Sequence, residues 1–288
     1  MTIVVTGATG HLGRLVVESL LRRGASPGEV VATGRNAQRL AELADALGVR
    51  TAVADYADPY SLRTAFQGAD RVLLVSGTEM GQRVAQHAAV AQAARDAGVA
   101  LLAYTSIPHA DTAEMALATE HRETERVIRE SGVPFTFLRN SWYLENYLTQ
   151  LPAYLEHGVV GAAGDGRISA ATRGDFADAA AAALLDPDSA GRVHELGGAG
   201  FTLAELAATV ADASGRPVTY TEVSPDQLTV ILVGAGLPQA YAEALVSADL
   251  GIARGELEVN TGDLERLIGR TPTSLRDAVG ASLATLAA

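Results

Sequence analysis

Three glycines, Gly7, Gly10 and Gly13, lie between a short β-branched run and a stretch whose leucines and valines recur at helical spacing. A strand, a glycine turn and a helix in this order can hold a pyrophosphate, because glycine lets the backbone approach closely and the helix N-terminus offers unpaired N–H groups. The pattern is G-x-x-G-x-x-G, with Ala8 where the dinucleotide-binding motif has a glycine. It predicts a nucleotide site; the alternative is a plain tight turn between a strand and a helix.

A second position with chemical consequences follows the next predicted strand, Val30–Gly34, where Arg35 and Asn36 stand about 20 residues past the glycines. An acidic residue at this strand end binds the ribose 2′-hydroxyl of NAD, whereas an arginine pairs with the 2′-phosphate of NADP. Arg35 therefore predicts NADP(H), with an ordinary surface residue at the start of the next helix as the alternative. Asp55, at the end of the third predicted strand, could contact adenine or cap the short helix after Pro59.

The proton-donating residues of an ordinary short-chain dehydrogenase are incomplete in this chain. Such enzymes pair a serine at the fifth strand end with a Tyr-x-x-x-Lys motif on the following helix. Ser106 is in place, but all 22 Lys-or-Arg residues are arginine, so the motif cannot exist. His121 stands about where the motif would be, and it could be a site residue or an ordinary helix residue.

The missing acid constrains the reaction. Reduction of a ketone leaves an alkoxide that needs a proton donor, whereas a quinone that accepts a hydride becomes a delocalised, weakly basic oxyanion. A cationic dye accepts a hydride with no proton at all. The sequence therefore predicts a conjugated, electron-poor acceptor, or no catalysis.

Composition and missing motifs exclude several other classes of function. The formal charge of −12 argues against a nucleic-acid groove, which needs a basic surface. The chain has no cysteine, its six histidines lack metal-ligand spacing, and we expect no metal site. It has neither a G-x-S-x-G elbow nor a P-loop lysine. The N-terminus enters a strand at once, and the longest apolar run, Leu228–Leu237, is too short for a bilayer, so we expect a cytoplasmic protein without membrane insertion.

The candidate residues must be positioned by an alternation of strands and helices. This alternation implies a parallel sheet with right-handed crossovers, in which ligands bind outside the carboxyl ends of the strands. Strands are expected at 3–5, 30–34, 50–54, 71–75, 100–104 and 134–138. The candidate residues at their carboxyl ends are Gly7, Arg35, Asp55, Ser76, Ser106 and Asn140.

Beyond Asn140 the pattern loosens, and we expect a smaller α+β lobe. Residues 141–147 carry the only tryptophan and two of the eight tyrosines, and could line a pocket for a flat ligand or form the core of the lobe. We predict an α/β fold with a doubly wound Rossmann domain over 1–155, to which a segment near 167–198 partly returns. The lobe over 156–288 would frame the substrate.

Several local elements of the lobe are also predicted. Residues 158–166 have the glycine content of a hairpin, and 168–172 has the pattern of a further strand. Residues 193–196 are expected to return to the main sheet. A helix is expected after Thr202, which would act as N-cap with Glu205 completing a capping box.

Taken together, these residues resemble the NmrA-like atypical short-chain dehydrogenases over nearly the whole chain. Within that family the likeness is strongest to the bacterial type 2 NAD(P)H:quinone oxidoreductases, followed by the triphenylmethane-dye reductases. The glycine turn alone is a weak signal, and the long middle motifs are more specific. The segments that carry the resemblance are 6–13, 35–36, 54–56, 103–106, 109–112, 120–125, 138–147, 161–166 and 267–270.

The resemblance implies a flavin-free, NADPH-dependent quinone reductase with a Rossmann domain. The residues expected to hold the cofactor are Gly7, Thr9, Gly10, His11, Leu12, Arg35, Asn36, Asp55, Ser76, Tyr104, Thr105, His121 and Phe137. The acceptor is expected beside Asn140, Tyr143 and Ser106, which would position it without a Tyr–Lys acid pair. His11 stands where the nearest relatives would have glutamine, which leaves the pyrophosphate contacts open in detail.

Two alternative functions fit the same residues. NmrA itself binds a dinucleotide and controls a partner protein without turnover, and the missing acid is compatible with such a sensor. A triphenylmethane-dye reductase is the second alternative. The aromatic segment after Asn140 favours the enzyme, whose partner would be a small quinone-like molecule. The sequence leaves open the physiological acceptor and the oligomeric state, for which a homodimer would be unsurprising.

Overall fold

The computed structural model describes residues 1–287 and contains a seven-stranded parallel sheet in the order β3-β2-β1-β4-β5-β6-β8. The strands are β1 (Ile3–Val5), β2 (Val30–Gly34), β3 (Arg50–Val53), β4 (Arg71–Leu74), β5 (Leu101–Ser106), β6 (Phe135–Asn140) and β8 (Val193–Leu196). The central strands are apolar and buried because helices cover both faces of the sheet. The strand order reverses between β1 and β4, which confirms the predicted doubly wound fold.

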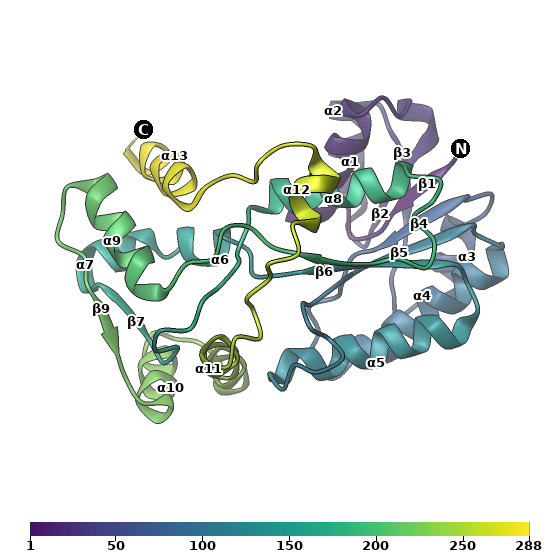
Figure 1. Ribbon diagram of the computed structural model, residues 1–288. Coiled ribbons are helices and arrows are strands. Elements are labelled where there is room, and N and C mark those ends of the chain that lie inside the picture. The colour runs from purple at the N-terminus through teal and green to yellow at the C-terminus, as the bar shows by residue number, and fades with distance from the viewer. Residues whose placement is uncertain (288) are drawn as a thin grey trace.

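Two layers of helices cover the sheet. Figure 1 shows α1, α2, α8 and α12 above it and α3, α4 and α5 below it. The upper helices are α1 (His11–Arg22), α2 (Ala37–Leu47), α8 (Arg173–Leu185) and α12 (Asp263–Ile268), and the lower ones are α3 (Pro59–Ala65), α4 (Arg83–Ala97) and α5 (Ala116–Ser131). A 3-10 turn, η1 (Pro27–Glu29), precedes β2. Helix α8 is rich in alanine, so it packs closely on α1 in the upper core.

The remaining elements form a smaller α+β part, on the left in Figure 1, with a core of its own. They are α6 (Glu145–Leu148), α7 (Leu151–His157), β7 (Val159–Gly161), α9 (Leu203–Ser214), β9 (Tyr220–Glu222), α10 (Pro225–Gly234), α11 (Gln239–Ala253) and α13 (Leu275–Ala287). The predicted start of α9 is confirmed: Thr202 is the N-cap, and its capping box with Glu205 is complete.

Two local predictions for this part are wrong. Residues 158–166 do not form a hairpin, because β7 pairs in parallel with β9, and a parallel pair needs a long crossover. Residues 168–172 do not form a strand, since their backbone bonds are shared among different segments. Ile168 N–H bonds to Phe201, and Ala171 N–H bonds to Trp142, and each makes only an isolated bridge.

The later part of the chain contributes to the main sheet. Strand β8 pairs in parallel with β6, as expected for residues 193–196, and α8 and α12 cover the same face as α1. The division of the chain at residue 155 stays a prediction. Over residues 1–287, no helix is long and apolar enough to cross a membrane.

Candidate functional site

A cavity of about 400 Å³ lies at the carboxyl edge of the sheet, where the strand order reverses. This is where open α/β sheets bind their ligands. Residues at the carboxyl ends of five neighbouring strands line it, together with Tyr143 and Arg173 from later in the chain. The sequence-predicted site residues that line it are Gly7, Thr9, Gly10, His11, Leu12, Arg35, Asp55, Ser76, Thr105 and Tyr143.

The glycine turn has the geometry of a phosphate cradle. Gly7 has a φ of +60°, and its carbonyl accepts from Gly10 N–H at 2.9 Å. A Cβ on Gly13 would lie 2.4 Å from that carbonyl oxygen, so a larger residue would push α1 away from the turn. Helix α1 begins at His11 with no side-chain cap in the part of the chain that the structure describes, so its first N–H groups are available to an anion. These residues fit a pyrophosphate.

Tyr56 links the residues that follow β1 and β4 beneath the glycine turn, a role that sequence reasoning did not assign. Its hydroxyl donates to the Val75 carbonyl at 2.8 Å and is hydrogen-bonded to Thr6 Oγ1, which also accepts from Val75 N–H at 3.0 Å. Burial raises the pKa of Tyr56, so the phenol stays protonated. The ends of β1 and β4 are thereby fixed on either side of the cavity.

Arg35 extends into the cavity from the end of β2. Its Nη1 lies 2.7 Å from Glu79 Oε1, and both side chains are exposed. Hydrogen bonds from Gln86 and Arg35 lower the pKa of the Glu79 carboxyl, which is therefore ionised. Its neighbour Asn36 does not line the cavity, because its side chain accepts from Arg39 N–H at 3.0 Å and caps α2.

The structure distinguishes between the two roles proposed for Asp55, contact with adenine and capping of α3. Helix α3 is capped by Asp58, whose side chain accepts from Tyr60 N–H at 3.0 Å, so capping by Asp55 is wrong. Asp55 lies in the cavity wall beside Tyr56. Its carboxylate accepts from Ala57 N–H at 3.0 Å, which leaves further acceptor capacity for a ligand.

The other end of the cavity is formed by Ser76, Thr105, Tyr143 and Arg173. Thr105 Oγ1 accepts from Ser76 N–H at 2.9 Å. The Arg173 guanidinium lies 4.8 Å from the centroid of the Tyr143 ring, and its Nη2 donates to Asn146 Oδ1 at 2.9 Å. Burial raises the pKa of Tyr143, which therefore keeps its phenolic proton. This end combines a neutral hydroxyl donor with a cation, Arg173, whose Nη1 lies 3.7 Å from Glu145 Oε2.

Arg173 was missed by the sequence analysis, although one signal pointed to it. It is the first residue of α8, whose N-cap is Thr172. A cation at a helix N-terminus is unfavourable with respect to the helix dipole, so its presence there suggests a role other than helix stability.

Three predicted cofactor residues lie behind the sheet, outside the cavity lining. Tyr104 and Phe137 are fully buried in the lower core. Tyr104 Oη is 2.7 Å from Nδ1 of the buried His121, and burial lowers the pKa of His121 well below its usual value. The side chains of these residues pack against one another on the side of the sheet covered by α4 and α5. They therefore support the strands that carry the cavity and do not line the cavity itself.

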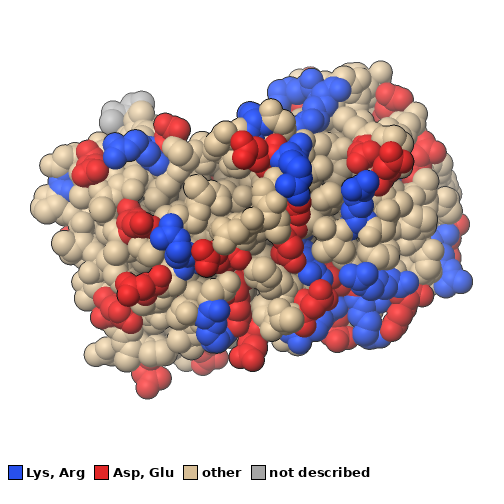
Figure 2. Space-filling view, viewed as in Figure 1, with Lys and Arg blue, Asp and Glu red and all other residues tan. Residues whose placement is uncertain are grey.

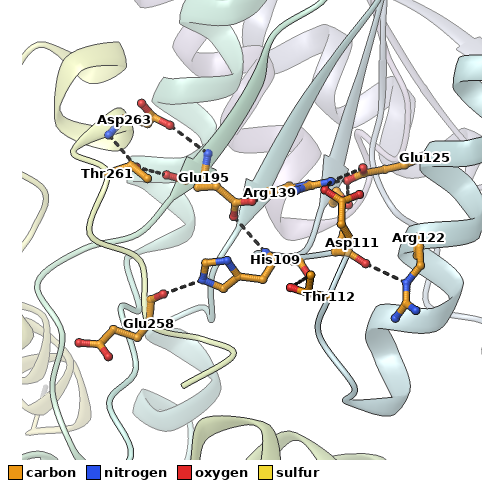
Figure 3. Close-up of polar contacts among 12 residues, drawn as sticks. His109, Asp111, Thr112, Arg122, Glu125, Arg139, Glu195, Glu258, Thr261 and Asp263 are labelled. Atoms are coloured by element: carbon orange, nitrogen blue, oxygen red, sulfur yellow. Dashed lines mark hydrogen bonds and ion pairs between the residues drawn. The ribbon is translucent and has the colours of Figure 1, made fainter. Parts of the chain in front are cut away.

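Ser106, the predicted catalytic serine, belongs to a buried ionic cluster. Its hydroxyl donates to Glu125 Oε1 at 2.7 Å, and Arg139 donates to the same carboxylate. Arg139 also reaches Glu195 and Asp111, at 2.9 and 2.8 Å, in the arrangement shown in Figure 3. Since its hydroxyl is committed to Glu125, Ser106 is not a cavity residue.

The cluster continues to the smaller part of the protein through His109. This residue has a φ of +51°, and its N–H donates to Glu195 Oε2 at 3.1 Å. Its Nε2 lies 2.8 Å from the Glu258 carbonyl oxygen, and Figure 3 shows this side chain pointing from the loop after β5 toward the Glu258 segment. The cluster therefore ties the sheet to the segment near Glu258.

Asn140, at the end of β6, is 5% exposed and does not line the cavity. Its Oδ1 has no hydrogen-bond partner within residues 1–287. A buried acceptor left unpaired costs free energy. Its predicted role in positioning the acceptor stays a prediction.

The electrostatic character of the molecule is mixed. On the face in Figure 2, basic and acidic side chains are interspersed, without a continuous basic surface. In the described residues, no group of three or more His, Asp or Glu side chains could hold a metal ion.

Comparison with known proteins assigns this chain to a family. The model of the NmrA-like family matches residues 1–277. The chain belongs to the NmrA-like family. It is 45% identical to quinone oxidoreductase 2 of Escherichia coli K12 over 279 residues, which is 96% of this chain and 97% of that protein. The family resemblance predicted from the motifs is thereby confirmed.

Solved structures of NmrA-like reductases superpose closely. The E. coli NADPH-dependent quinone oxidoreductase QOR2, complexed with NADPH, gives a TM-score of 0.95 at 43% identity, with 98% of this chain and 100% of that chain covered. The Citrobacter sp. triphenylmethane reductase, complexed with NADP(H), gives 0.92 at 36% identity, with 98% and 100% covered. The arrangement of the whole chain is thus shared with these reductases.

Proposed function

We propose that this protein is an NADPH-dependent, flavin-free reductase that transfers a hydride to a quinone or a similar conjugated acceptor. The observation that carries the proposal is the cavity at the reversal of strand order. It has a phosphate cradle and Arg35 at one end, and Tyr143 and Arg173 at the other. Its relatives support it, since the E. coli protein that is 45% identical is a quinone oxidoreductase.

NADPH supplies the hydride when bound, and residues of both the turn and the strand ends would hold it. The glycine turn and the first N–H groups of α1 would bind the pyrophosphate. Arg35 would pair with the 2′-phosphate, since a guanidinium group can bind phosphate through bidentate hydrogen bonds. Asp55 would lie beside the adenine. Ser76 and Thr105 would line the space for the nicotinamide.

The acceptor end of the cavity suits a product that is an anion. A quinone that gains a hydride becomes a hydroquinone monoanion, whose charge is spread over the phenolate oxygen and the ring. The Arg173 guanidinium would stabilise that charge, and the protonated Tyr143 hydroxyl would donate a hydrogen bond to it. Ordinary water can then supply the final proton, so a Tyr–Lys pair is not required.

Turnover of the purified protein tests this proposal. We expect a simple para-quinone to be reduced with NADPH in preference to NADH. Arg35→Ala should raise the KM for NADPH about tenfold, because a charge-assisted hydrogen bond contributes ~1.5 kcal/mol, and leave the KM for NADH nearly unchanged. Loss of NADPH absorbance measures both. Tight NADPH binding without turnover of quinones or cationic dyes would indicate an NmrA-type sensor instead, and no dinucleotide binding would contradict both functions.

A triphenylmethane dye is the second candidate acceptor, favoured by the superposition with the Citrobacter reductase. Such a dye is a cation, and the Arg173 guanidinium, only part of whose charge is offset by Glu145 at 3.7 Å, repels a cation at its end of the cavity. We therefore expect quinones to be the better substrates, and Arg173→Ala to shift the ratio of kcat/KM values toward the dye.

We further propose that the protein acts in the cytoplasm on small molecules and does not bind nucleic acid. The acidic net charge of −12 and the interspersed charges on the face in Figure 2 argue against a nucleic-acid partner. The homodimer stays a prediction, which light scattering of the purified protein would test.

A further inference from the structure

The residue expected to bind the 2′-phosphate already has an anionic partner. Arg35 Nη1 donates to Glu79 Oε1 at 2.7 Å, and Gln86 Nε2 donates to the second oxygen, Oε2, at 2.8 Å. Both oxygens of Glu79 are therefore engaged, one by the phosphate-binding cation and one by a side chain of α4. Arg35, Glu79 and Gln86 all line the cavity.

The pair bridges the two sides of the crevice. Arg35 follows β2 and Glu79 lies in the loop that follows β4, and β1 with its glycine turn lies between those strands. Two strand spacings separate β2 from β4 by about 10 Å, so the contact spans the end of the strand on which a dinucleotide would rest. Its side chains are 65% and 43% exposed, so the contact can open without disturbing the core.

We propose that Glu79 is a specificity-determining residue for the cofactor, an internal carboxylate that competes with the 2′-phosphate for Arg35. The inference rests on the proposed function, since it assigns a partner to Arg35 in the same cavity. A phosphate monoester carries more negative charge than a carboxylate and pairs more strongly with a guanidinium, so it competes with Glu79 for the Arg35 Nη1 donor. Pairing of the phosphate with Arg35 must replace the existing contact with Glu79, which lowers the affinity for NADPH. NADH has a hydroxyl at the ribose 2′ position, so its binding does not require the contact between Arg35 and Glu79 to break.

Calorimetric binding of NADPH and NADH to the full-length protein tests the proposal. Glu79→Gln removes the charge but keeps an oxygen that can accept from Gln86. We expect it to tighten NADPH binding about two- to fivefold, the range for an exposed ion pair, and to change NADH binding by less than half as much.

Two further variants separate competition from a general effect of charge. Glu42→Gln removes the same charge from α2, where Glu42 accepts only from Gln38 at 3.2 Å, and it should leave NADPH affinity unchanged. In an Arg35→Ala background, the gain from Glu79→Gln should disappear, because there is no cation left to compete for.

The outcomes are distinct. An unchanged or weaker NADPH affinity in Glu79→Gln, or an equal gain for NADH, would overturn the proposal. The same gain in the Arg35→Ala background would also overturn it, since direct repulsion rather than competition would then be the cause. Quinone turnover is measured separately: its failure with the expected affinity pattern intact would contradict the reductase and leave the role of Glu79 standing.

Discussion

At the scale of single residues, His87 shows how a buried histidine shapes a site that it does not line. Its Nε2 lies 3.0 Å from Gly77 N and accepts that backbone hydrogen bond, so its proton is on Nδ1, which donates to Thr124 Oγ1 at 3.0 Å. Burial, with a smaller effect of Arg83, lowers the pKa of His87 to about 3. The neutral histidine therefore holds the turn at Gly77, which lines the cavity.

This depressed pKa predicts how stability changes with pH. In the unfolded chain His87 titrates near 6.5, and in the folded protein near 3. The unfolded state binds the proton more readily, so the contribution of His87 is complete above pH 6.5 and falls by ~1.4 kcal/mol per pH unit toward pH 3. Denaturant unfolding at pH 7, 5.5 and 4.5 measures this slope. His87→Gln should flatten it by about that amount, and equal slopes for the two proteins would contradict the assignment.

At the scale of elements, the ionic cluster around Arg139 joins parts of the fold that sequence distance separates. Arg139 on β6 contacts Glu125 on α5, Glu195 on β8 and Asp111 in the loop after β5. Arg139 and Glu125 are 5% and 3% exposed. A buried charge pair of this kind fixes geometry, because either partner left alone would be an uncompensated charge.

Removing the central cation should therefore be costly. We expect Arg139→Met to lower the free energy of unfolding by about 3–5 kcal/mol, because Glu125 would stay buried without its partner. Arg126→Met is the matched control on α5: its partners Glu123 and Glu130 are exposed, so the loss should be less than ~1 kcal/mol. Urea unfolding compares the two variants, and similar losses would show that the cluster is not the cause.

At the scale of the whole molecule, the late part of the chain completes the early sheet. Helix α8 covers α1, and Ser19 on α1 donates to Asp178 on α8 at 2.6 Å. Arg71 at the start of β4 donates to the carbonyls of Leu184 and Asp186, at 2.8 and 2.7 Å. These contacts join the sheet to the late segment that covers it, and we expect the two to unfold together.

A truncated chain tests that cooperation and the predicted domain boundary together. Residues 1–155 alone would expose the apolar face of α1 and one side of β6. We expect this fragment to be collapsed but without fixed side-chain packing, seen as lost near-ultraviolet circular dichroism and poor amide dispersion. A fragment that unfolds cooperatively would instead support an independent domain that ends at 155.

The sequence by itself determined the elements of the main sheet and the glycine turn, because both depend on local spacing. The glycine turn, the alternation of apolar strands with amphipathic helices and the position of Arg35 at a strand end can be read within short windows. These led to the sheet, to the family and to half of the residues in the cavity wall.

The tertiary structure alone decided which strand-end residues face the cavity and which distant ones join them. Successive side chains of a strand point to opposite faces, so on β5 Thr105 lines the cavity while Tyr104 and Ser106 face the lower helices. Strand ends known only to within a residue or two cannot settle that choice. Glu79 reaches the site through the path of the loop after β4, and Arg173 reaches it through the packing of α8, and neither position can be read from local spacing alone.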